Sequence, residues 1–142
     1  MNNDGPKGLT VRIKHFLSML TYFIFIDAIW IIFVAKPLYM QELGVIATEK
    51  PDLIIVAALI YAILYAGLHV FVLMGLWRGK SGHMLSMEAI LYGLSVYGVY
   101  TMTNYLVIPK WSMLLVATDI AWGIFLCLST VLLGIWLRRF DR

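Results

Sequence analysis

Four long runs of mostly hydrophobic residues, separated by short polar stretches, make up most of this 142-residue chain. The runs cover about residues 16–35, 53–77, 87–108 and 111–137. A helix needs about 20 mostly apolar residues to cross the hydrocarbon core of a bilayer. Each run has that length and holds at most one internal ionisable residue. The pattern predicts an all-α, polytopic membrane protein that folds as an antiparallel bundle of four transmembrane helices.

The polar stretches predict two tails and three connections. The connection between the first two helices is expected to be a loop, because it contains Pro37, Gly44 and Pro51. The connection at Pro109 and Lys110 is so short that the last two helices must form a tight hairpin. The polar segments are a cytoplasmic N-terminal tail over 1–15, loops over 36–52, 78–86 and 109–110, and a basic tail over 138–142.

Basic residues predict which way the bundle is oriented. One side receives eight of them, from the two tails and the second loop: Lys7, Arg12, Lys14, Arg78, Lys80, Arg138, Arg139 and Arg142. The other side receives three, namely Lys36, Lys50 and Lys110. Cytoplasmic loops carry the excess of Lys and Arg, so both termini are predicted to be cytoplasmic. Trp77, Trp111 and Trp136 fall at predicted helix ends, as in an interfacial aromatic belt.

Composition supports a membrane protein and narrows its chemistry. Hydrophobic residues make up 62% of the chain and charged residues 13%, against about 45–50% and about 25% in soluble domains. The net charge of +3 is too small and too scattered for nucleic-acid binding. Cys127 is the only cysteine, and the three histidines match no metal-ligand spacing. We therefore predict no metal, no cofactor and no nucleic-acid partner.

Two aspartates inside the hydrophobic runs are the main functional clue. An acid at membrane depth costs at least about 2.5–3.5 kcal/mol and usually faces a bundle interior or a wet cavity. Asp27 and Asp119 each begin the pattern D-x-x-W, which puts the acid and Trp30 or Trp122 on one helix face. Counting about 1.5 Å per residue, both acids lie about 12–14 Å from the outer end of their helices. They are expected to meet at one level.

Other polar side chains fall near that level on the second and third helices. The predicted binding pocket comprises Asp27, Trp30, Tyr61, Tyr65, Tyr97, Tyr100, Thr101, Asn104, Asp119 and Trp122. Two carboxyls brought together in a medium of low dielectric constant would favour sharing one proton. The alternative is that the acids only accept hydrogen bonds that fasten helices together, bonds that average about 0.6 kcal/mol in membranes.

Several motifs of the chain resemble a family of small bacterial membrane proteins classed as a domain of unknown function. The resemblance covers about residues 20–130 and rests on IDAIW (26–30), LY-x-x-x-LG (38–44), IYAILYAGLHVF (60–71), YGVYTMTN (97–104), Trp111 and DIAWG (119–123). It implies a four-helix, multi-pass protein of the bacterial inner membrane. In one respect the chain departs from the family pattern: Thr101 stands where the resemblance implies an acid.

Three function classes remain open from the sequence. A protein that binds or transports a small molecule or ion, with proton coupling, fits the paired acids best, and at this size it would work as a homo-oligomer. A membrane enzyme acting on a lipid or lipid-linked substrate would use Asp27 and Asp119 as acid and base. A structural subunit would contact its partners through helix faces in the lipid bilayer.

Overall fold

The structure is a computed structural model in which residues 6–44 and 53–140 are described. Over these residues the chain is almost entirely helical, as the hydrophobic pattern predicts. The helical segments are α1 (Pro6–Trp30), the π-helix η1 (Ile31–Ala35), α2 (Lys36–Leu43), α3 (Leu53–Leu68), the π-helix η2 (His69–Leu73), α4 (Met74–Trp77), α5 (Gly82–Val107) and α6 (Met113–Arg139). The two π segments continue their neighbours without a break, so the eight segments form four long helices.

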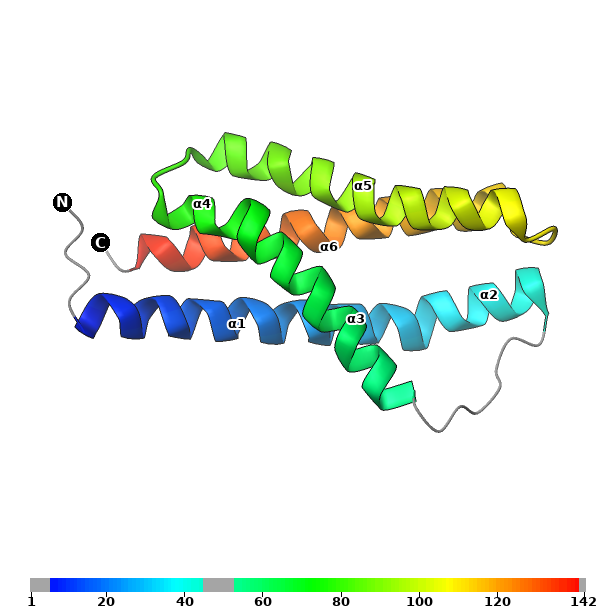
Figure 1. Cartoon of the computed structure of the whole chain (residues 1–142), viewed down its shortest axis with the longest axis horizontal. Helices are drawn as coiled ribbons and strands as arrows, with labels where there is room; N and C mark the ends of the chain where they lie inside the picture. Colours follow the sequence, from blue (N-terminus) through cyan, green and yellow to red (C-terminus); the bar gives the residue numbers. More distant parts are fainter. Residues whose placement is uncertain (1–5, 45–52, 141–142) are drawn as a thin grey trace.

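Three of these helices, among the described residues, are long and apolar enough to cross a membrane. They are Gly8–Leu43, Ile54–Trp77 and Met113–Arg139. The remaining long helix, α5, has 26 residues but is made less apolar by its tyrosines, glycines and hydroxyl side chains. It runs antiparallel to α6 along most of its length (Figure 1) and therefore covers the same depth. The fold is an antiparallel four-helix bundle of a membrane protein.

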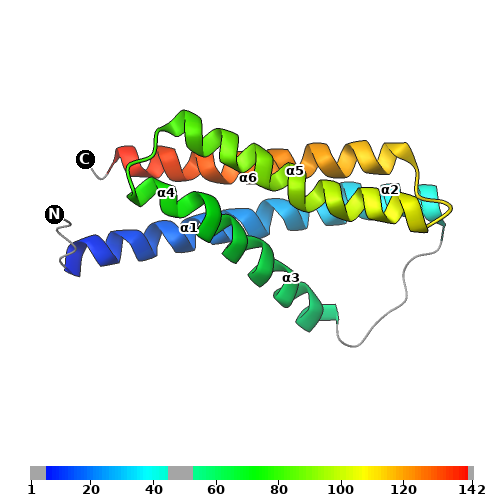
Figure 2. The same ribbon diagram turned by 45° about the horizontal axis from the view of Figure 1, so that its top comes forward.

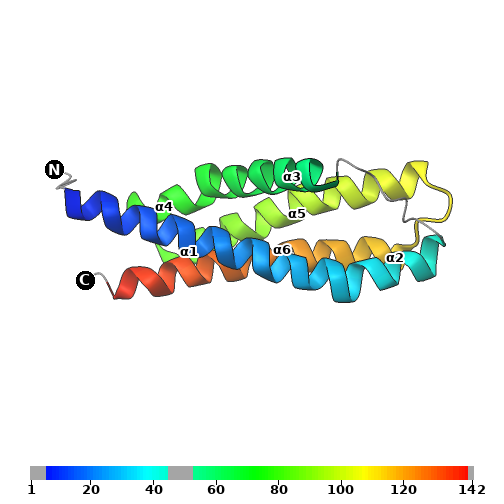
Figure 3. The ribbon, with the colours of Figure 1, turned by 90° about the horizontal axis from the view of Figure 1, so that it is seen from below.

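Helix α6 is the centre of the arrangement. It packs against α5 on one side and against α1 on the other, and both η2 and α4 also contact it. The start of α1 and the end of α6 lie at the same end of the molecule, together with the turn between α4 and α5 (Figures 1 and 3). The hairpin between α5 and α6 lies at the opposite end, beside α2.

The interior near the start of α1 is a conventional hydrophobic core. Twelve buried residues form it: Met19, Phe23, Tyr65, Leu68, Val72, Leu73, Leu76, Leu85, Ala89, Leu126, Cys127 and Val131. A smaller cluster of Trp111, Leu115 and Val116 lies at the opposite end, with Leu38, Tyr39 and Leu43 of α2 packed against it. The polar side chains described below come from the region between these two clusters.

Helices α5 and α6 approach so closely that glycine is required where they cross. A Cβ atom added to Gly93 would lie 2.4 Å from the carbonyl oxygen of Gly123. Close backbone approach through small residues is a common way for membrane helices to associate. By contrast, Ala58, Ala62 and Ala66 of α3 are exposed, so this small-residue stripe does not pack inside the bundle.

The first long helix, formed by α1, η1 and α2, extends further than the sequence predicts. A loop was expected from Lys36, but the chain stays helical through Leu43. Proline inside a helix removes a hydrogen bond and clashes with the carbonyl four residues earlier. The wide π turn ends at Ala35, two residues before Pro37, and the amide of Lys36 donates to the carbonyl of Ile31, five residues back. The helix thus accommodates the proline by widening rather than by ending. The rest of the predicted loop, residues 45–52, lies outside the described residues.

Helix α3 leaves the bundle toward its first residue. Figures 1 and 2 show α3 crossing α1 at an angle and separating from the other helices. Its first turns are accordingly exposed, with Ile54 at 83% and Ile63 at 71%. Only the later part of this helix, from Tyr65 onward, contributes to the buried core.

Candidate functional site

Asp27 of α1 is buried, with 5% of its surface exposed, and points at α6. The indole Nε1 of Trp122 donates a hydrogen bond to its Oδ1 at 2.7 Å. The hydroxyl of Tyr61, from α3, lies close to this carboxyl. Trp122 in turn stacks on Trp30, with ring centres 4.4 Å apart and planes within 5° of parallel. Both D-x-x-W motifs thus contribute to one cluster, which joins α1, α3 and α6.

Asp119 of α6 is buried to the same extent and has a different set of partners. The hydroxyl of Tyr39, from α2, lies 2.7 Å from each of its two carboxyl oxygens. The side chain of Thr101, from α5, lies close to this carboxyl, and its hydroxyl oxygen accepts a hydrogen bond from the indole Nε1 of Trp111 at 3.1 Å. Trp111 therefore holds Thr101 beside Asp119.

The π turn explains how Tyr39 reaches Asp119. Twelve residues separate Asp27 from Tyr39, which in a regular α-helix would place them about 120° apart around the axis. A π turn absorbs one extra residue, so the effective separation is eleven residues and about 20°. Asp27 and Tyr39 consequently lie on one face of the long helix, and both meet α6.

Tyr97 of α5 links the surroundings of the two acids. Its ring packs on Gly123, where any added Cβ atom would lie 2.3 Å from the ring. Gly123 follows Asp119 by one helical turn and Trp122 by one residue, so the phenol lies near both carboxyls. Because residue 123 is a glycine, the large side chain of Tyr97 can lie near both Asp27 and Asp119.

The two carboxyls lie close in depth, but each binds its own donors. Asp27 meets α6 at Trp122, three residues from Asp119, which corresponds to about 4.5 Å along the axis. The depth predicted for Asp27 assumed that its helix ended near Lys36. Since the helix ends at Leu43, Asp27 lies 16 residues from that end and near the middle of the Gly8–Leu43 helix. The contacts of the two acids are with tyrosine, threonine and tryptophan rather than with each other.

The other predicted pocket residues differ in where they lie. Tyr100 is half exposed, packs edge-on against Trp111 and lies close to Asn104, so these two residues lie at the edge of the group around Asp119. Tyr65 lies elsewhere: its hydroxyl donates to the carbonyl oxygen of Phe16 at 2.9 Å. Phe16 precedes Asp27 by eleven residues, about three turns. Tyr65 therefore belongs to the hydrophobic core.

Two residues of the site are absent from the predicted pocket. Tyr39 was assigned to a loop, and only the π turn brings it to Asp119. Trp111 was interpreted as an interfacial belt residue, but it is 6% exposed and its indole binds Thr101. The signal that could have identified both is the pair of acids, because a buried carboxyl needs hydrogen-bond donors from the residues around it.

The chemistry of the site follows from its donors. The partners of the two carboxyls are a tryptophan, two tyrosines and a threonine, all uncharged. A buried charge without a countercharge is costly, so such a carboxyl is expected to be protonated or to pair with a cation. The stacked indoles beside Asp27 add a surface of the kind that attracts cations.

The fold and the site define a helical membrane protein with a pair of buried acids in its bundle. Residues 12–136 match a family described as "Predicted membrane protein (DUF2177)", and the chain belongs to this family. The resemblance seen in the sequence motifs is thereby confirmed. No curated protein and no solved structure matches the chain.

Proposed function

We propose that the two aspartates bind a small organic cation inside the membrane in exchange for a proton, and that the protein transports or senses that cation. The observation that carries the proposal is the contact set of Asp27 and Asp119. Both are 5% exposed and both are held by uncharged donors only, within the described residues. A protonated aspartate in such a site releases its proton when a cation binds to the carboxylate.

The aromatic side chains support an organic cation rather than a metal ion. Trp30 and Trp122 stack beside Asp27, and Tyr61 and Tyr97 lie close by. A carboxylate next to tryptophan and tyrosine rings recognises ammonium groups through charge and cation–π attraction together. Among the described residues, no group of three or more His, Cys, Asp or Glu side chains is placed to hold a metal ion.

Proton release on ligand binding tests this function directly. Full-length protein in weakly buffered detergent solution would be titrated with benzylammonium and tetramethylammonium, and pH would be followed with an indicator dye. We expect the protein to release protons in a saturable manner. Asp27→Asn and Asp119→Asn should each lower the release, because an amide carries no exchangeable carboxyl proton.

A matched acid elsewhere in the chain provides the control. Glu88 of α5 pairs with Lys80 near the opposite end of the helix from Thr101, so Glu88→Gln should release protons as the unmodified protein does. If neither probe releases protons while all variants remain folded, the acids serve to fasten helices together. The protein would then be a structural subunit of a membrane assembly.

A further inference from the structure

A cavity of about 310 Å³ lies far from the two aspartates, at the end of the bundle where α1 begins and α6 ends. It is bounded by the turn between α4 and α5 and by the last turns of α6. The lining residues are Leu76, Gly79, Lys80, Ser81, Gly82, Leu85, Ile135, Arg138 and Arg139. The volume is at the small end of the range for ligand pockets, which suits a headgroup rather than a whole lipid.

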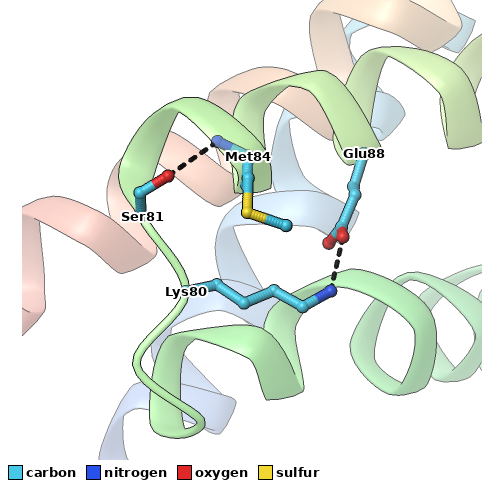
Figure 4. A network of polar contacts seen from close by, with 4 residues as sticks. All are labelled: Lys80, Ser81, Met84 and Glu88. Atoms are coloured by element: carbon cyan, nitrogen blue, oxygen red, sulfur yellow. Dashed lines mark hydrogen bonds and ion pairs between the residues drawn. The ribbon is translucent and has the colours of Figure 1, made fainter.

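Three of the lining residues are basic, and none of the lining residues is acidic. Lys80 forms an ion pair with Glu88, which lies in the second turn of α5 (Figure 4). Its side chain packs over Gly75, where an added Cβ atom would lie 2.8 Å from its Cδ. Lys80 is thus fixed in place and its charge is balanced, so the excess positive charge of the cavity comes from the two arginines.

Arg138 is anchored with donors to spare. One of its terminal nitrogens donates to the carbonyl oxygen of Leu76, which ties the end of α6 to the end of α4. A guanidinium carries five N–H donors in a planar fork, so most of them stay available to a ligand. Arg139 follows directly and is exposed. Two adjacent arginines, one of them fixed by the backbone, are well suited to bind an anion with several oxygens.

The first turn of α5 adds a second source of positive potential. Ser81 caps this helix by accepting a hydrogen bond from the amide of Met84 (Figure 4). The first amides of a helix have no partner inside it, and the positive end of the helix dipole lies there. Ser81 and Gly82 both line the cavity, so this end of a 26-residue helix faces the same space as the arginines.

The remaining walls are apolar and lie near the ends of the membrane-spanning helices. Leu76, Leu85 and Ile135 line the cavity, and the exposed Trp136 follows Ile135 in α6. From these observations we propose that the cavity binds a phosphate group, carried by the headgroup of an anionic phospholipid. Basic pockets between helix ends at the membrane surface have the chemistry to hold such headgroups. The apolar walls would accompany the first part of the acyl chains.

Native mass spectrometry of the full-length protein tests the proposal. The protein in neutral detergent would be titrated with phosphatidylglycerol and with phosphatidylcholine of identical acyl chains. We expect tighter binding of the anionic lipid and about a fivefold loss of affinity in Arg139→Gln. Arg138→Gln should lose at least as much, and circular dichroism would establish that it is still folded.

Lys14→Gln is the matched control, because Lys14 is an exposed cation on α1 near the same end of the bundle. Its affinity for phosphatidylglycerol should stay that of the unmodified protein. An equal loss in Lys14→Gln and Arg139→Gln would overturn the proposal, since it would indicate general attraction to a basic surface. Equal binding of both lipids, unchanged in the arginine variants, would overturn it as well.

Inorganic phosphate as a competitor identifies the source of the ligand. If it fails to displace phosphatidylglycerol, the phosphate site takes a lipid. If millimolar phosphate displaces the lipid from the unmodified protein and displaces it less well from Arg139→Gln, the cavity is still a phosphate site. Its ligand would then come from the aqueous phase.

Discussion

At Asp119 the hydroxyl of Tyr39 lies 2.7 Å from both carboxyl oxygens, so a single hydroxyl contacts the whole carboxyl group. Removing this donor leaves a buried acid with the Thr101 side chain as its nearest polar neighbour. A buried acceptor that loses its donor costs more than the average intramembrane hydrogen bond. The contact therefore contributes to stability as well as to the site.

Tyr39→Phe should lower the free energy of unfolding by about 1–2 kcal/mol. Denaturation of the purified protein in mixed micelles would measure the loss. Tyr105→Phe is the control, because Tyr105 lies on the exposed side of the neighbouring helix and its substitution should change little. In the double variant with Asp119→Leu, which leaves no acceptor at this position, the two losses should not add, since both changes remove the same bond. Strict additivity would contradict the assigned contact.

The acids and the tryptophans of the site were predictable from single residues. Asp27 and Asp119 are the only acids deep in the hydrophobic runs, and the cost of placing them there indicates a shared interior. Trp30 and Trp122 follow from the three-residue step. Tyr39 and Trp111 were not predictable in this way, because the position of each depends on how a helix end is built rather than on its own residue type.

At the scale of helices, the pair α5 and α6 depends on one close crossing. Gly93→Ala would place a Cβ atom 2.4 Å from the Gly123 oxygen, so the helices would have to separate. Such overpacking typically costs about 1–3 kcal/mol, and unfolding in mixed micelles should show a loss of that size.

Gly98→Ala is the matched control in the same helix. A Cβ atom there would meet Leu94 at 3.7 Å and Ile120 at 4.0 Å, which is ordinary contact. Alanine also favours a helix over glycine by about 1 kcal/mol, so this variant should be as stable as the unmodified protein or more so. Equal destabilisation by both substitutions would show that the crossing is not at Gly93.

The existence of the four helices followed from hydrophobic length alone, but the end of the first helix did not. Pro37 ordinarily indicates that a helix has ended. The same residue is compatible with a helix when a π turn precedes it, and no composition or periodicity signals such a turn. The stripe of Ala58, Ala62 and Ala66 is a similar case: small residues four apart are typical of close helix contacts, but their side chains are exposed in the structure.

At the scale of the whole molecule, the antiparallel arrangement fixes which loops share a side. The turn after α4 lies with the start of α1, and the hairpin after α5 lies at the other end. With eight basic residues against three, we expect the end that holds the start of α1 to be cytoplasmic.

Single cysteines introduced at His83 and at Lys110 test this topology. Cys127 would first be replaced by alanine to leave no native thiol. A membrane-impermeant maleimide applied to intact cells should label Lys110→Cys, and should label His83→Cys only after the membrane is permeabilised. Both positions are exposed, so accessibility in the folded protein is not limiting. Labelling of both from one side would show that α5 does not cross.

The wide turn at Ile31–Ala35 has a consequence for how the length of this helix can change. With twelve residues between Asp27 and Tyr39, both side chains face α6 only because the π turn absorbs one extra residue. A spacing of eleven residues would bring both side chains to α6 in a regular α-helix, without a π turn. A spacing of ten or thirteen residues would rotate the Tyr39 phenol away from the Asp119 carboxyl. Relatives that retain both side chains should therefore come in two lengths here, and the shorter ones should lack a proline at the place of Pro37.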